Sequence, residues 1–404
     1  MPIHLLKYSW TRLFFNANLT RIMEDKKLKI LARLFQENKI SLEEISEIIG
    51  VPKNELRDLF LREGFIKTRT LLVAGGAGFI GSNFIRHILE KYPHYKIVNY
   101  DKLTYAGNLD NLRNVEKDPR YIFIQGDISD SKNIEKVIQE HDIEAIINFA
   151  AESHVGRSVM YGAEEFVRTN VLGVHSLLEA AKRNPHKIKI YIQISTDETY
   201  GTLSLTDTQK FTEDTGFAPN VPYAAAKGGG DLLCRAYNRS YNVPVIVTHC
   251  SNNYGPYQHP EKLIPNSMFR ALRNQPIMLH GGGQHVRDWI YVQDHCEAVD
   301  LILHRGQPGE VYNIGSDNEK STLEIAKIIL KILGKPESLI TQVPDRPGND
   351  LRYSIDTAKI RSELGWKPRQ IFEEGIFKTI QWYQHNLDWV ERIREKDKEF
   401  SKYI

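Results

Sequence analysis

The run of residues 70–101 restricts the fold of this 404-residue chain more than any other stretch. In it, a short apolar segment, a glycine-rich turn, an amphipathic segment and a second apolar segment follow one another as TLLVAG, GAGFIG, SNFIRHILEKY and KIVNYD. Further apolar, strand-like segments come later, separated by helical stretches: YIFIQGD, AIINFAAE, IKIYIQIS and PVIVTHC. Strands that alternate with helices build a parallel sheet with helices on both faces. The sequence therefore predicts an α/β fold with a doubly wound parallel sheet.

The glycine-rich turn has the pattern of a dinucleotide site. Gly75, Gly78 and Gly81 lie between the first strand and its helix, where missing side chains let the backbone approach a pyrophosphate at the helix N-terminus. Asp101 ends the second strand 26 residues beyond Gly75, and a carboxylate there binds ribose hydroxyls and favours NAD over NADP. Asp127, after the third strand, is expected to flank the adenine; the alternative for this residue alone is a helix N-cap.

The length of the chain and its change of pattern indicate more than one domain. After residue 255 the alternation gives way to loops with Pro and Gly, and helices are expected at 264–274, 293–305 and 322–333. We predict three parts: a helical appendage, residues 1–68; an NAD-binding Rossmann domain with the catalytic residues, 69–255; and a smaller α/β substrate lobe with a C-terminal helix, 256–404.

The first 68 residues have helical patterning in KKLKILARLFQEN, SLEEISEIIG and KNELRDLFLREGF. Ser41 and Glu44 have the spacing of a capping box for the second helix, and Gly50 is placed to end it. Two short helices around a tight turn also suit a DNA-binding helix-turn-helix, with Lys53, Arg57 and Arg62 on the later helix.

The charge of this segment argues against nucleic-acid binding. Residues 1–68 hold twelve Lys and Arg against nine Asp and Glu, whereas DNA-binding domains carry a pronounced basic patch. We therefore favour a small helical appendage that packs on the rest of the protein or on a partner subunit.

Composition excludes several other classes of protein. The formal net charge is +2, so no overall field favours a nucleic acid or a membrane surface. Cys234, Cys250 and Cys296 are scattered, which excludes a disulfide framework and a cysteine zinc site and suits a reducing compartment. No run approaches the roughly 20 apolar residues that span a bilayer. We expect a cytoplasmic protein with no membrane segment, no signal peptide and no metal.

The segment YAAAK places Tyr223 and Lys227 four residues apart, on one face of a helix. An ammonium beside a phenol is expected to lower the pKa of the phenol from about 10 toward the working pH. A phenolate near a nicotinamide takes a proton from a sugar hydroxyl while the carbon loses a hydride. Taken alone, the same spacing also fits a solvated helix face.

The segment ISTDETYG places Thr196, Asp197 and Glu198 just past the end of a predicted strand. Two adjacent carboxylates repel each other and lose hydration, so stability alone does not favour them there. Such a pair has pKa values that are pushed apart, which favours one protonated and one ionised carboxyl at neutral pH. The pattern indicates an acid and a base for proton transfer; a strand-end cap is the alternative.

Taken together, the motifs resemble those of the extended short-chain dehydrogenases/reductases and, more closely, the dTDP-glucose 4,6-dehydratases. The resemblance covers about residues 69–390 and rests on GGAGFIGSNF, DKLTYAGNL, GDI, FAAESHV, STDETYG, YAAAK, SNNYGPYQHPEKLIP, VRDWIYVQDH, YNIGS and DRPGNDLRY. It implies an NAD-dependent hydro-lyase of deoxysugar biosynthesis, which oxidises a nucleotide sugar at C4, eliminates water across C5 and C6, and returns the hydride to C6. It also implies a tightly held, recycled NAD and a homodimer.

The resemblance also implies a role for each catalytic residue. Tyr223 is the base at O4, with Lys227 tuning it and Thr196 hydrogen-bonding the same oxygen. Glu198 removes the C5 proton, and Asp197 protonates the departing C6 hydroxyl.

Further residues are expected around the two ligands. The cofactor residues are Gly75, Gly78, Phe79, Ile80, Gly81, Asp101, Lys102, Leu103, Thr104, Asp127, Ile128, Ala150, Ala151, Ser153, Thr169, Tyr223, Lys227 and Asn253. The substrate residues are His154, Thr196, Asn252, Lys262, Leu263, Met278, His280, Arg287, Asn313, Asp345, Arg346 and Asn349. From its dipeptide alone, Arg287 fits a phosphate ligand and a partner for Asp288 about equally well.

Three departures from the family pattern bear on function. Gly156 replaces an aspartate of the HVDRS motif, and Asn349 stands where the family often has a histidine near the base. Gly228, Gly229 and Gly230 follow Lys227 in a predicted helix, where each glycine costs roughly 1 kcal/mol against alanine. A close contact with the nicotinamide side or with another helix would explain them.

Three alternatives stay open from the sequence. The first is a 4,6-dehydratase of UDP-sugars, because Asn349 leaves the choice of base unsettled. The second is a C4 epimerase or a decarboxylase of UDP-glucuronate, which the Asp197–Glu198 pair disfavours. The third is an NAD-sensing, DNA-binding regulator, which the appendage and Gly156 suggest and the intact catalytic set disfavours.

Overall fold

The structure is a computed structural model of the whole chain, and it describes residues 24–36 and 39–396. The described chain forms two compact units. One comprises the described residues up to Arg69 together with Glu90–Lys96, and the other comprises Thr70–Leu89 and everything from Ile97 onward.

The N-terminal unit contains the three helices expected from the sequence: α1 (Glu24–Gln36), α2 (Leu42–Ile49) and α3 (Lys53–Arg62). Their inward faces form one apolar core around Ala32, Phe35, Leu42, Ile45, Leu56 and Phe60. The capping box of Ser41 and Glu44 is present, and Gly50 ends α2 in the left-handed region with φ 70°. These local predictions are confirmed.

Charge pairing weakens the DNA-binding interpretation of this unit. Lys53 pairs with Glu43 of α2, and Arg57 pairs with its neighbour Asp58 at 2.7 Å. The side chain of Arg62 lies outside the described residues. Two of the three cations on α3 are therefore already neutralised by carboxylates.

The second unit is built on a seven-stranded sheet in the order β10-β6-β5-β4-β1-β2-β3, whose paired strands run parallel. Its strands are β1 (Arg69–Ala74), β2 (Tyr95–Asp101), β3 (Tyr121–Gln125), β4 (Ile143–Asn148), β5 (Ile190–Thr196), β6 (Val245–Cys250) and β10 (Val311–Ile314). The central strands are buried almost throughout, whereas β3 at the sheet edge is only partly buried. The predicted doubly wound parallel sheet is confirmed.

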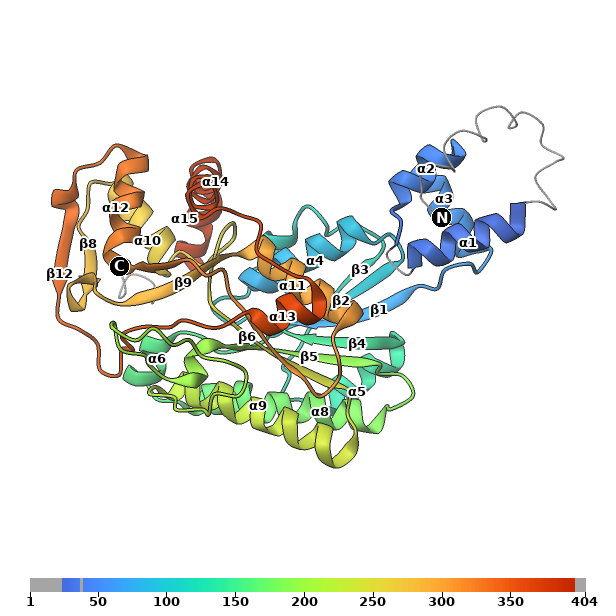
Figure 1. Cartoon of the computed structure of the whole chain (residues 1–404), viewed down its shortest axis with the longest axis horizontal. Helices are drawn as coiled ribbons and strands as arrows, with labels where there is room; N and C mark the ends of the chain where they lie inside the picture. The colour runs from blue at the N-terminus through green and yellow to red at the C-terminus, as the bar shows by residue number, and fades with distance from the viewer. Residues whose placement is uncertain (1–23, 37–38, 397–404) are drawn as a thin grey trace. The chain divides into compact units, whose positions relative to one another are not determined.

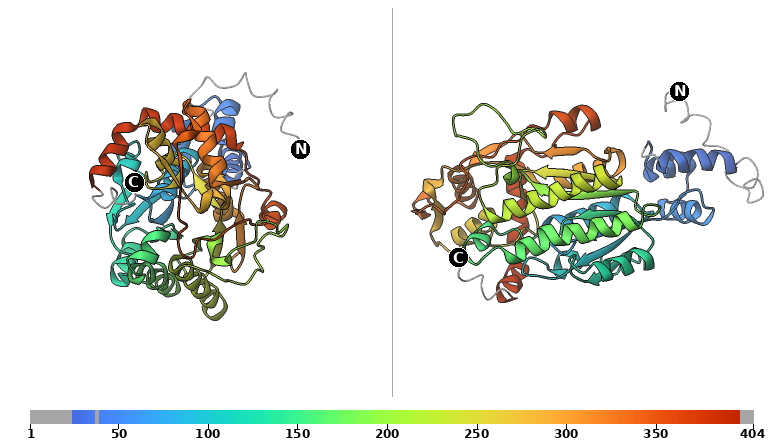
Figure 2. Two further views of the ribbon diagram at one scale, coloured as in Figure 1. Left: turned by 90° about the vertical axis from the view of Figure 1, so that its left-hand side faces the viewer. Right: turned by 90° about the horizontal axis from the view of Figure 1, so that it is seen from below.

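Helices cover both faces of this sheet (Figure 1). On one face lie α5 (Ser131–Glu140), α8 (Val174–Arg183) and α9 (Pro222–Tyr241), which cross the front of the right-hand view in Figure 2. On the other lie α4 (Phe79–Lys91), α11 (Val292–Arg305) and α13 (Ala358–Leu364). A large apolar core joins the strands to the first group of helices, with Leu177, Leu178 and Tyr191 fully buried in it.

The remaining elements form a smaller α/β lobe. It has a three-stranded sheet, β11-β9-β7, and a two-stranded sheet, β12-β8. Its strands are β7 (Asn252–Tyr254), β8 (Ile277–His280), β9 (Val286–Tyr291), β11 (Glu319–Ser321) and β12 (Ile340–Val343), and its helices are α10 (Leu263–Leu272), α12 (Thr322–Leu333), α14 (Phe372–His385) and α15 (Leu387–Lys396). The helices expected at 264–274, 293–305 and 322–333 are present as α10, α11 and α12. Both lobes belong to one compact unit, so the boundary at residue 255 stays a prediction.

Among the described residues, no helix is both long enough and apolar enough to cross a membrane.

Candidate active site

A pocket opens at the carboxyl ends of the strands of the large sheet, where ligands bind in doubly wound folds. The chain runs outward from β1 to β2 and β3, and then returns to place β4 on the other side of β1. The pocket is lined by the turns after β1 and β4 and by the ends of β2, β5 and β6. It therefore lies at the switch point of the strand order.

The glycine turn is shaped for close backbone approach. Gly75 has φ 74°, and a Cβ atom there would lie 2.4 Å from the backbone nitrogen of Ala150, after β4. A Cβ atom at Gly81 would lie 2.4 Å from the carbonyl oxygen of Gly75. Side chains at both positions are thus excluded, and the N-terminus of α4 faces the pocket, as a pyrophosphate requires.

Asp101 is almost fully buried at the end of β2. Its Oδ2 accepts the N–H of Ala77 in the glycine turn at 2.9 Å, and its Oδ1 accepts the N–H of Leu103 at 2.8 Å. Burial raises the pKa of this carboxyl, and the two backbone donors oppose that rise. The carboxylate lines the pocket at the place expected for a ribose ligand.

Asp127 is not a helix N-cap, because Asp130 has that role at the start of α5. Instead, Asp127 accepts hydrogen bonds from the N–H and the hydroxyl of Ser129 and pairs with Lys102 at 2.9 Å. The N-cap alternative is therefore wrong for this residue. Asp127 and Lys102 both line the pocket.

The expected cofactor residues lie together with one exception. The pocket wall contains Gly75, Gly78, Phe79, Ile80, Gly81, Asp101, Lys102, Thr104, Asp127, Ile128, Ala150, Ala151, Ser153, Thr169, Tyr223, Lys227 and Asn253. Leu103 is not in the wall; with φ 57° it turns the loop and donates its N–H to Asp101.

The acid–base triplet stands where β5 passes into the 3-10 helix η4 (Asp197–Tyr200). Thr196 is the N-cap of this short helix, and its hydroxyl accepts the N–H of Glu198 at 3.4 Å and donates to Asp197 Oδ1 at 3.4 Å. Asp197 is 2% exposed. All three residues line the pocket, so the sequence expectation that they stand together at a strand end is confirmed.

Burial raises the pKa values of both carboxyls above those of exposed carboxylates. It raises the pKa of Asp197 well above its usual value, and the adjacent Glu198 raises it further. It raises the pKa of Glu198 to about 7, opposed by the positive charges of Arg287, Lys262 and Arg346. At neutral pH the pair can thus provide one neutral acid and one base.

Tyr223 and Lys227 stand on α9 and both line the pocket. The expected lowering of the phenol pKa is wrong for this structure: burial raises the pKa of Tyr223 well above 10, and the charge of Glu198 adds to the rise. The Nζ of Lys227 donates to the backbone oxygen of Ile194 at 2.6 Å, and Lys227 is not among the groups that shift the Tyr223 pKa. The hydrogen bond with Thr196 is the contribution that favours the phenolate.

The expected substrate residues form two groups. Thr196, Asn252 and Lys262 line the pocket itself. Arg287 and Arg346 do not, but the charge of each acts on Glu198, as does that of Lys262. Three positive charges therefore act on the carboxyl that is expected to be the base.

Arg287, on β9, is not a partner of Asp288. Its guanidinium lies 4.1 Å over the ring of Tyr353 and donates to the backbone oxygens of Val286, Leu351 and Asp350 at 2.8–3.3 Å. Asp288 instead accepts from Ser316 and Asn318. The ion-pair alternative for Arg287 is therefore wrong.

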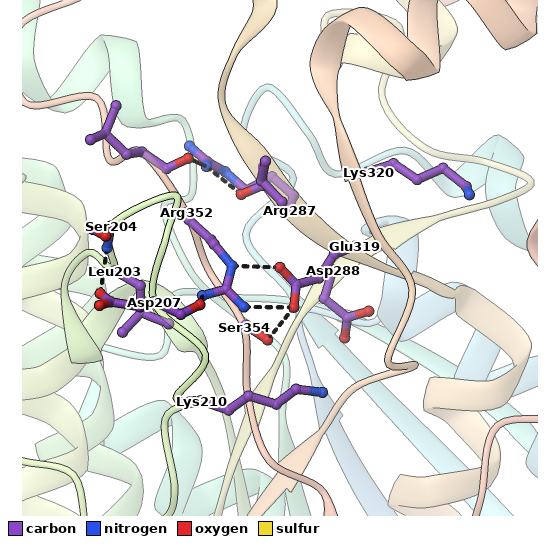
Figure 3. A network of polar contacts seen from close by, with 12 residues as sticks. Leu203, Ser204, Asp207, Lys210, Arg287, Asp288, Glu319, Lys320, Arg352 and Ser354 are labelled. Atoms are coloured by element: carbon purple, nitrogen blue, oxygen red, sulfur yellow. Dashed lines mark hydrogen bonds and ion pairs between the residues drawn. The ribbon is translucent and has the colours of Figure 1, made fainter.

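The segment that supports Arg287 is itself held by a partly buried ion pair (Figure 3). Arg352 forms a two-point contact with Glu319 of β11 at 2.6 and 2.9 Å and donates to the backbone oxygen of Asp207. Ser354 donates to the same glutamate at 2.7 Å. Such fork-like Arg–carboxylate contacts fix orientation, so residues 350–355 have a defined place beside β9.

Asn313 does not reach the pocket. It is fully buried on β10, its Nδ2 donates to the backbone oxygen of Phe211, and its Oδ1 accepts from the Tyr200 hydroxyl. The expectation that this side chain contacts substrate disagrees with the structure, because the strand register turns it into the protein interior.

Four other expected residues lie outside the pocket wall. His154 caps α6 (Val155–Met160) and lies 3.5 Å from Glu261. Leu263 begins α10 directly after Lys262. Met278 and His280 lie on β8, where Met278 is 43% exposed and His280 contacts the backbone oxygen of Pro344 at 2.9 Å.

Asn349 is part of a small polar cluster with His285. Asn349 Nδ2 lies 2.9 Å from His285 Nε2 and 2.8 Å from Asp345 Oδ1, and His285 Nε2 lies 2.9 Å from Asp345 Oδ2. The N–H of Arg346 donates to Asp345 as well. The cluster places the imidazole of His285 beside Asn349. The loop that contains Asn349 also carries Arg346, whose charge acts on Glu198.

Gly230 has the clearest structural reason among the three consecutive glycines. A Cβ atom there would lie 2.5 Å from the backbone oxygen of Asn170 in the π-helix η3 (Arg168–Gly173), which packs against α9. Gly228 and Gly229 would meet only side chains, those of Phe217 and Val171 at 3.3 Å. Close contact with another segment of the same chain therefore explains Gly230.

Gly156 lies on α6, and its nearest neighbour is the imidazole of His154 at 3.0 Å from a built Cβ atom. The structure gives no further reason for glycine at this position.

Sequence reasoning missed two residues near the acid–base pair. The charge of Asp350 raises the pKa of Glu198, and the charge of Glu198 raises the pKa of Tyr353. Tyr353 and Asp350 are joined by a hydrogen bond of 2.5 Å. Both belong to the second half of the motif DRPGNDLRY, whereas the substrate residues expected from this motif all lie in its first half. The strand-like end of that motif carried no turn or charge pattern that pointed to them.

The fold, the glycine turn against β4, and the Tyr223–Lys227 pair beside a strand-end polar triplet together define an extended short-chain dehydrogenase/reductase. Residues 72–379 match the family model for GDP-mannose 4,6 dehydratase. The dTDP-glucose 4,6-dehydratase of Xanthomonas campestris pv. campestris (strain B100) is 46% identical over 343 residues, 80% of this chain and 95% of the relative. That of Escherichia coli is 44% identical over 350 residues, 80% of this chain and 96% of the relative. The chain belongs to the dTDP-glucose 4,6-dehydratase family.

Solved structures give the same relationship. The dTDP-glucose 4,6-dehydratase of Bacillus anthracis str. Ames in complex with NAD has a TM-score of 0.75 and 46% identity, and covers 80% of this chain and 99% of its own. That of Streptomyces venezuelae with NAD bound has a TM-score of 0.77, 44% identity and the same coverage. The UDP-glucose 4-epimerase of Thermotoga maritima shares the fold at 28% identity, with a TM-score of 0.72, over 79% of this chain and 99% of its own.

Proposed function

We propose that this protein converts dTDP-glucose into dTDP-4-keto-6-deoxyglucose and water. The observation that carries the proposal is the adjacent pair of buried carboxyls, Asp197 and Glu198, in a pocket that also holds Tyr223 and Lys227. An oxidoreductase that only moves a hydride has no use for such a pair. A dehydratase needs both an acid and a base close to the outer carbons of the sugar.

The cofactor is NAD, which suits the exclusion of side chains at Gly75 and Gly81 and the carboxylate of Asp101 at the end of β2. When bound, it takes a hydride from C4 of the sugar and gives it back at C6. The protein holds it in the pocket wall described above, from the glycine turn to Tyr223 and Lys227.

The residues divide the proton transfers between them. Tyr223 removes the proton from O4 as a phenolate, the form that its hydrogen bond with Thr196 favours against the effect of burial, and Thr196 hydrogen-bonds the same sugar oxygen. The resulting 4-keto group acidifies the C5 proton, which Glu198 removes and gives back to C5 when the hydride returns to C6. Asp197, kept neutral by burial, donates its proton to the C6 hydroxyl, which then leaves as water.

Three cations suit a diphosphate. Lys262, Arg287 and Arg346 all lower the pKa of Glu198 through their charge, so all three lie within electrostatic reach of the reacting end of the pocket. Three of the five N–H donors of Arg287 are directed to backbone oxygens, which leaves donors for a phosphate. The loop from Asp345 to Asn349 is then expected to close over the nucleotide.

Product analysis tests the proposal. We expect the purified protein to convert dTDP-glucose into a 4-keto-6-deoxy sugar that absorbs in alkali and has lost one water by mass spectrometry, with no net NADH. Parallel reactions with UDP-glucose, GDP-mannose and CDP-glucose test which base and which sugar the protein accepts. They are needed because Asn349, with His285 beside it, stands where the family often has a histidine.

Other outcomes would support the alternatives. Preferred turnover of UDP-glucose would make the protein a UDP-sugar dehydratase. A C4 epimer or a decarboxylated product by NMR would overturn the dehydratase assignment. No turnover of any nucleotide sugar, with salt-dependent DNA binding by the full chain, would favour an NAD-sensing regulator.

We further propose that the protein is a homodimer that pairs through η3 and α9. These helices pack together, and both expose large apolar side chains: Val167 directly before η3 is 47% exposed, Leu172 is 55% and Leu232 is 58%. Exposed apolar patches of this kind commonly mark protein interfaces.

We also propose a cytoplasmic location, which the three buried, unpaired cysteines suit.

Light scattering tests the dimer. We expect the wild-type protein to be dimeric and Leu232→Glu to be monomeric, because a buried carboxylate would oppose association. Ile371→Glu, at an apolar position with 60% exposure directly before α14, is the control and should remain dimeric. A monomeric wild-type protein would contradict the proposal.

A further inference from the structure

A chain of buried polar side chains lies behind the acid–base pair, and none of the proposed proton transfers uses it. It runs from Asp231 on α9 through His249 on β6 and Tyr200 on η4 to Asn313 on β10. Each of the four is at most 4% exposed. Burying polar groups costs free energy unless they are paired, so such a chain needs a structural or functional reason.

Hydrogen bonds join these residues without a gap. Asp231 Oδ2 accepts from Ser195 Oγ at 2.5 Å and lies 3.2 Å from His249 Nε2. His249 Nδ1 lies 2.8 Å from the Tyr200 oxygen. The Tyr200 hydroxyl donates to Asn313 Oδ1 at 2.9 Å.

The sheet register brings three of the members to one level. Ser195 on β5 and Asn313 on β10 are both register partners of His249 on β6, which lies between them. This level is one residue before Thr196, the first residue of the catalytic triplet. The network therefore spans the strands that end at the active site.

Counting hydrogens shows how the network is held. Asn313 Nδ2 donates to the backbone oxygen of Phe211 at 3.1 Å, so its Oδ1 faces Tyr200 and accepts. Tyr200 gives its single hydrogen to that oxygen and must accept from His249 Nδ1. His249 Nε2 and Asp231 Oδ2 must then share one proton. The His–Asp pair is thus neutral as a whole, which lowers the free-energy cost of burying it.

Both ends of the network belong to elements that carry catalytic residues. Tyr200 closes η4, the same short helix that contains Asp197 and Glu198. Asp231 stands one turn after Lys227 on α9, and its charge favours the ammonium form of that lysine. The network therefore links the strand end to the helix that presents Tyr223 and Lys227.

We propose that Tyr200, His249 and Asp231 are positioning residues for the elimination step, an inference that rests on the proposed function. They do not line the pocket beside substrate. They hold η4 against β6 and α9, so that Asp197 and Glu198 stay at the distance from Tyr223 that lets elimination follow oxidation. A displacement of about 1 Å at such a site can cost up to about a hundredfold in rate.

Tyr200→Phe tests the inference with little risk to the fold. The ring is stacked on Phe211 at 5.3 Å between centroids and packs edge-on to Phe217 at 5.9 Å, so the variant keeps its packing and loses only the hydroxyl. In a single turnover with dTDP-glucose, we expect elimination to slow by about tenfold to a hundredfold. Oxidation and KM should change little, so the absorbance of reduced cofactor should build up transiently.

Tyr191→Phe is the matched control. Tyr191 is a fully buried tyrosine on the same strand as Ser195, and its hydroxyl bonds to Gln193 and Asn148 instead of the network. This variant should show the wild-type balance of oxidation and elimination, even if it unfolds at a lower temperature. A purely structural role for Tyr200 predicts the same result for both variants.

A double-mutant cycle tests whether the residues act together. If Tyr200 and Asp231 belong to one network, Tyr200→Phe with Asp231→Asn should slow elimination no more than the worse single variant. The inference would be overturned if the effects of the two substitutions simply added. It would also be overturned if Tyr200→Phe kept the wild-type ratio of oxidation rate to elimination rate. If the wild-type protein itself forms no dehydrated product, the proposed function fails, and the two failures are therefore distinguishable.

Discussion

Two neighbouring carboxyls do different chemistry because their surroundings differ. Asp197 is enclosed and its Oδ2 is buried without a hydrogen-bond partner among the described residues, so the neutral form is favoured. Glu198 is also buried, but Arg287, Lys262 and Arg346 act on it and hold its pKa at about 7. Arg287 lowers the pKa of both carboxyls, so at the residue scale the further charges of Lys262 and Arg346 on Glu198 favour Glu198 as the base and Asp197 as the acid.

The pKa of Glu198 predicts the pH dependence of elimination. Because the residue must be ionised to take the C5 proton, we expect the rate to fall as the pH drops below about 7, by about tenfold for each unit. Arg287→Gln removes a charge that lowers this pKa, so its profile should move to higher pH. Product formation at saturating substrate over a pH series measures both, and a wild-type rate that is flat through neutrality would contradict the assignment.

The sequence predicted the residues of the site better than their states. The strand pattern placed Thr196, Asp197 and Glu198 at a strand end, and the spacing of four placed Tyr223 and Lys227 on one helix face. Their meeting in one site followed from the family resemblance. The direction of the Tyr223 pKa was wrong, since it depends on Lys227 reaching the Ile194 oxygen and on burial, which no local pattern encodes. Asn313 was misplaced for the same reason, because its strand register turns it inward.

At the scale of elements, the contact between α9 and η3 places the catalytic helix. Glycines in a helix are unfavourable by themselves, yet Gly230 allows the backbone oxygen of Asn170 to come within 2.5 Å of a built Cβ position. The sequence indicated that these glycines needed a reason. Only the tertiary structure identifies which glycine is needed and what it contacts.

Gly230→Ala is expected to destabilise the protein by about 1–3 kcal/mol, because the added methyl meets backbone that cannot move without shifting η3. Gly229→Ala is the matched control. It meets only a side chain of Val171 at 3.3 Å and gains up to about 1 kcal/mol in helix propensity. Denaturant unfolding of both variants measures the difference; equal stabilities would show that the close contact is unimportant.

At the scale of the whole molecule, the residues that match the dehydratase family and the N-terminal helices occupy separate segments of the sequence. The family match begins at residue 72, and the helices α1 to α3 have an apolar core of their own. The capping box and Gly50 made these helices predictable, since caps are local signals. Their purpose was not predictable, because no charge or motif in them indicates a partner.

Removal of residues 1–68 should leave dehydration intact. Every residue that lines the pocket lies beyond residue 70, so we expect unchanged kcat and KM for dTDP-glucose. Steady-state assays of the truncated and full-length proteins measure this, with circular dichroism to show that the shortened protein is folded. A folded truncation with lost activity would show that the helices contribute to catalysis.

The division of labour between Asp197 and the redox residues is tested most directly by single-turnover kinetics of Asp197→Asn with dTDP-glucose. An amide of the same shape cannot supply the proton to the C6 hydroxyl. We predict that oxidation at C4 proceeds, that reduced cofactor accumulates, and that the 4-keto-6-deoxy product forms about a hundredfold or more slowly. Product formation at the wild-type rate, without accumulation of reduced cofactor, would contradict the assignment of Asp197 as the acid.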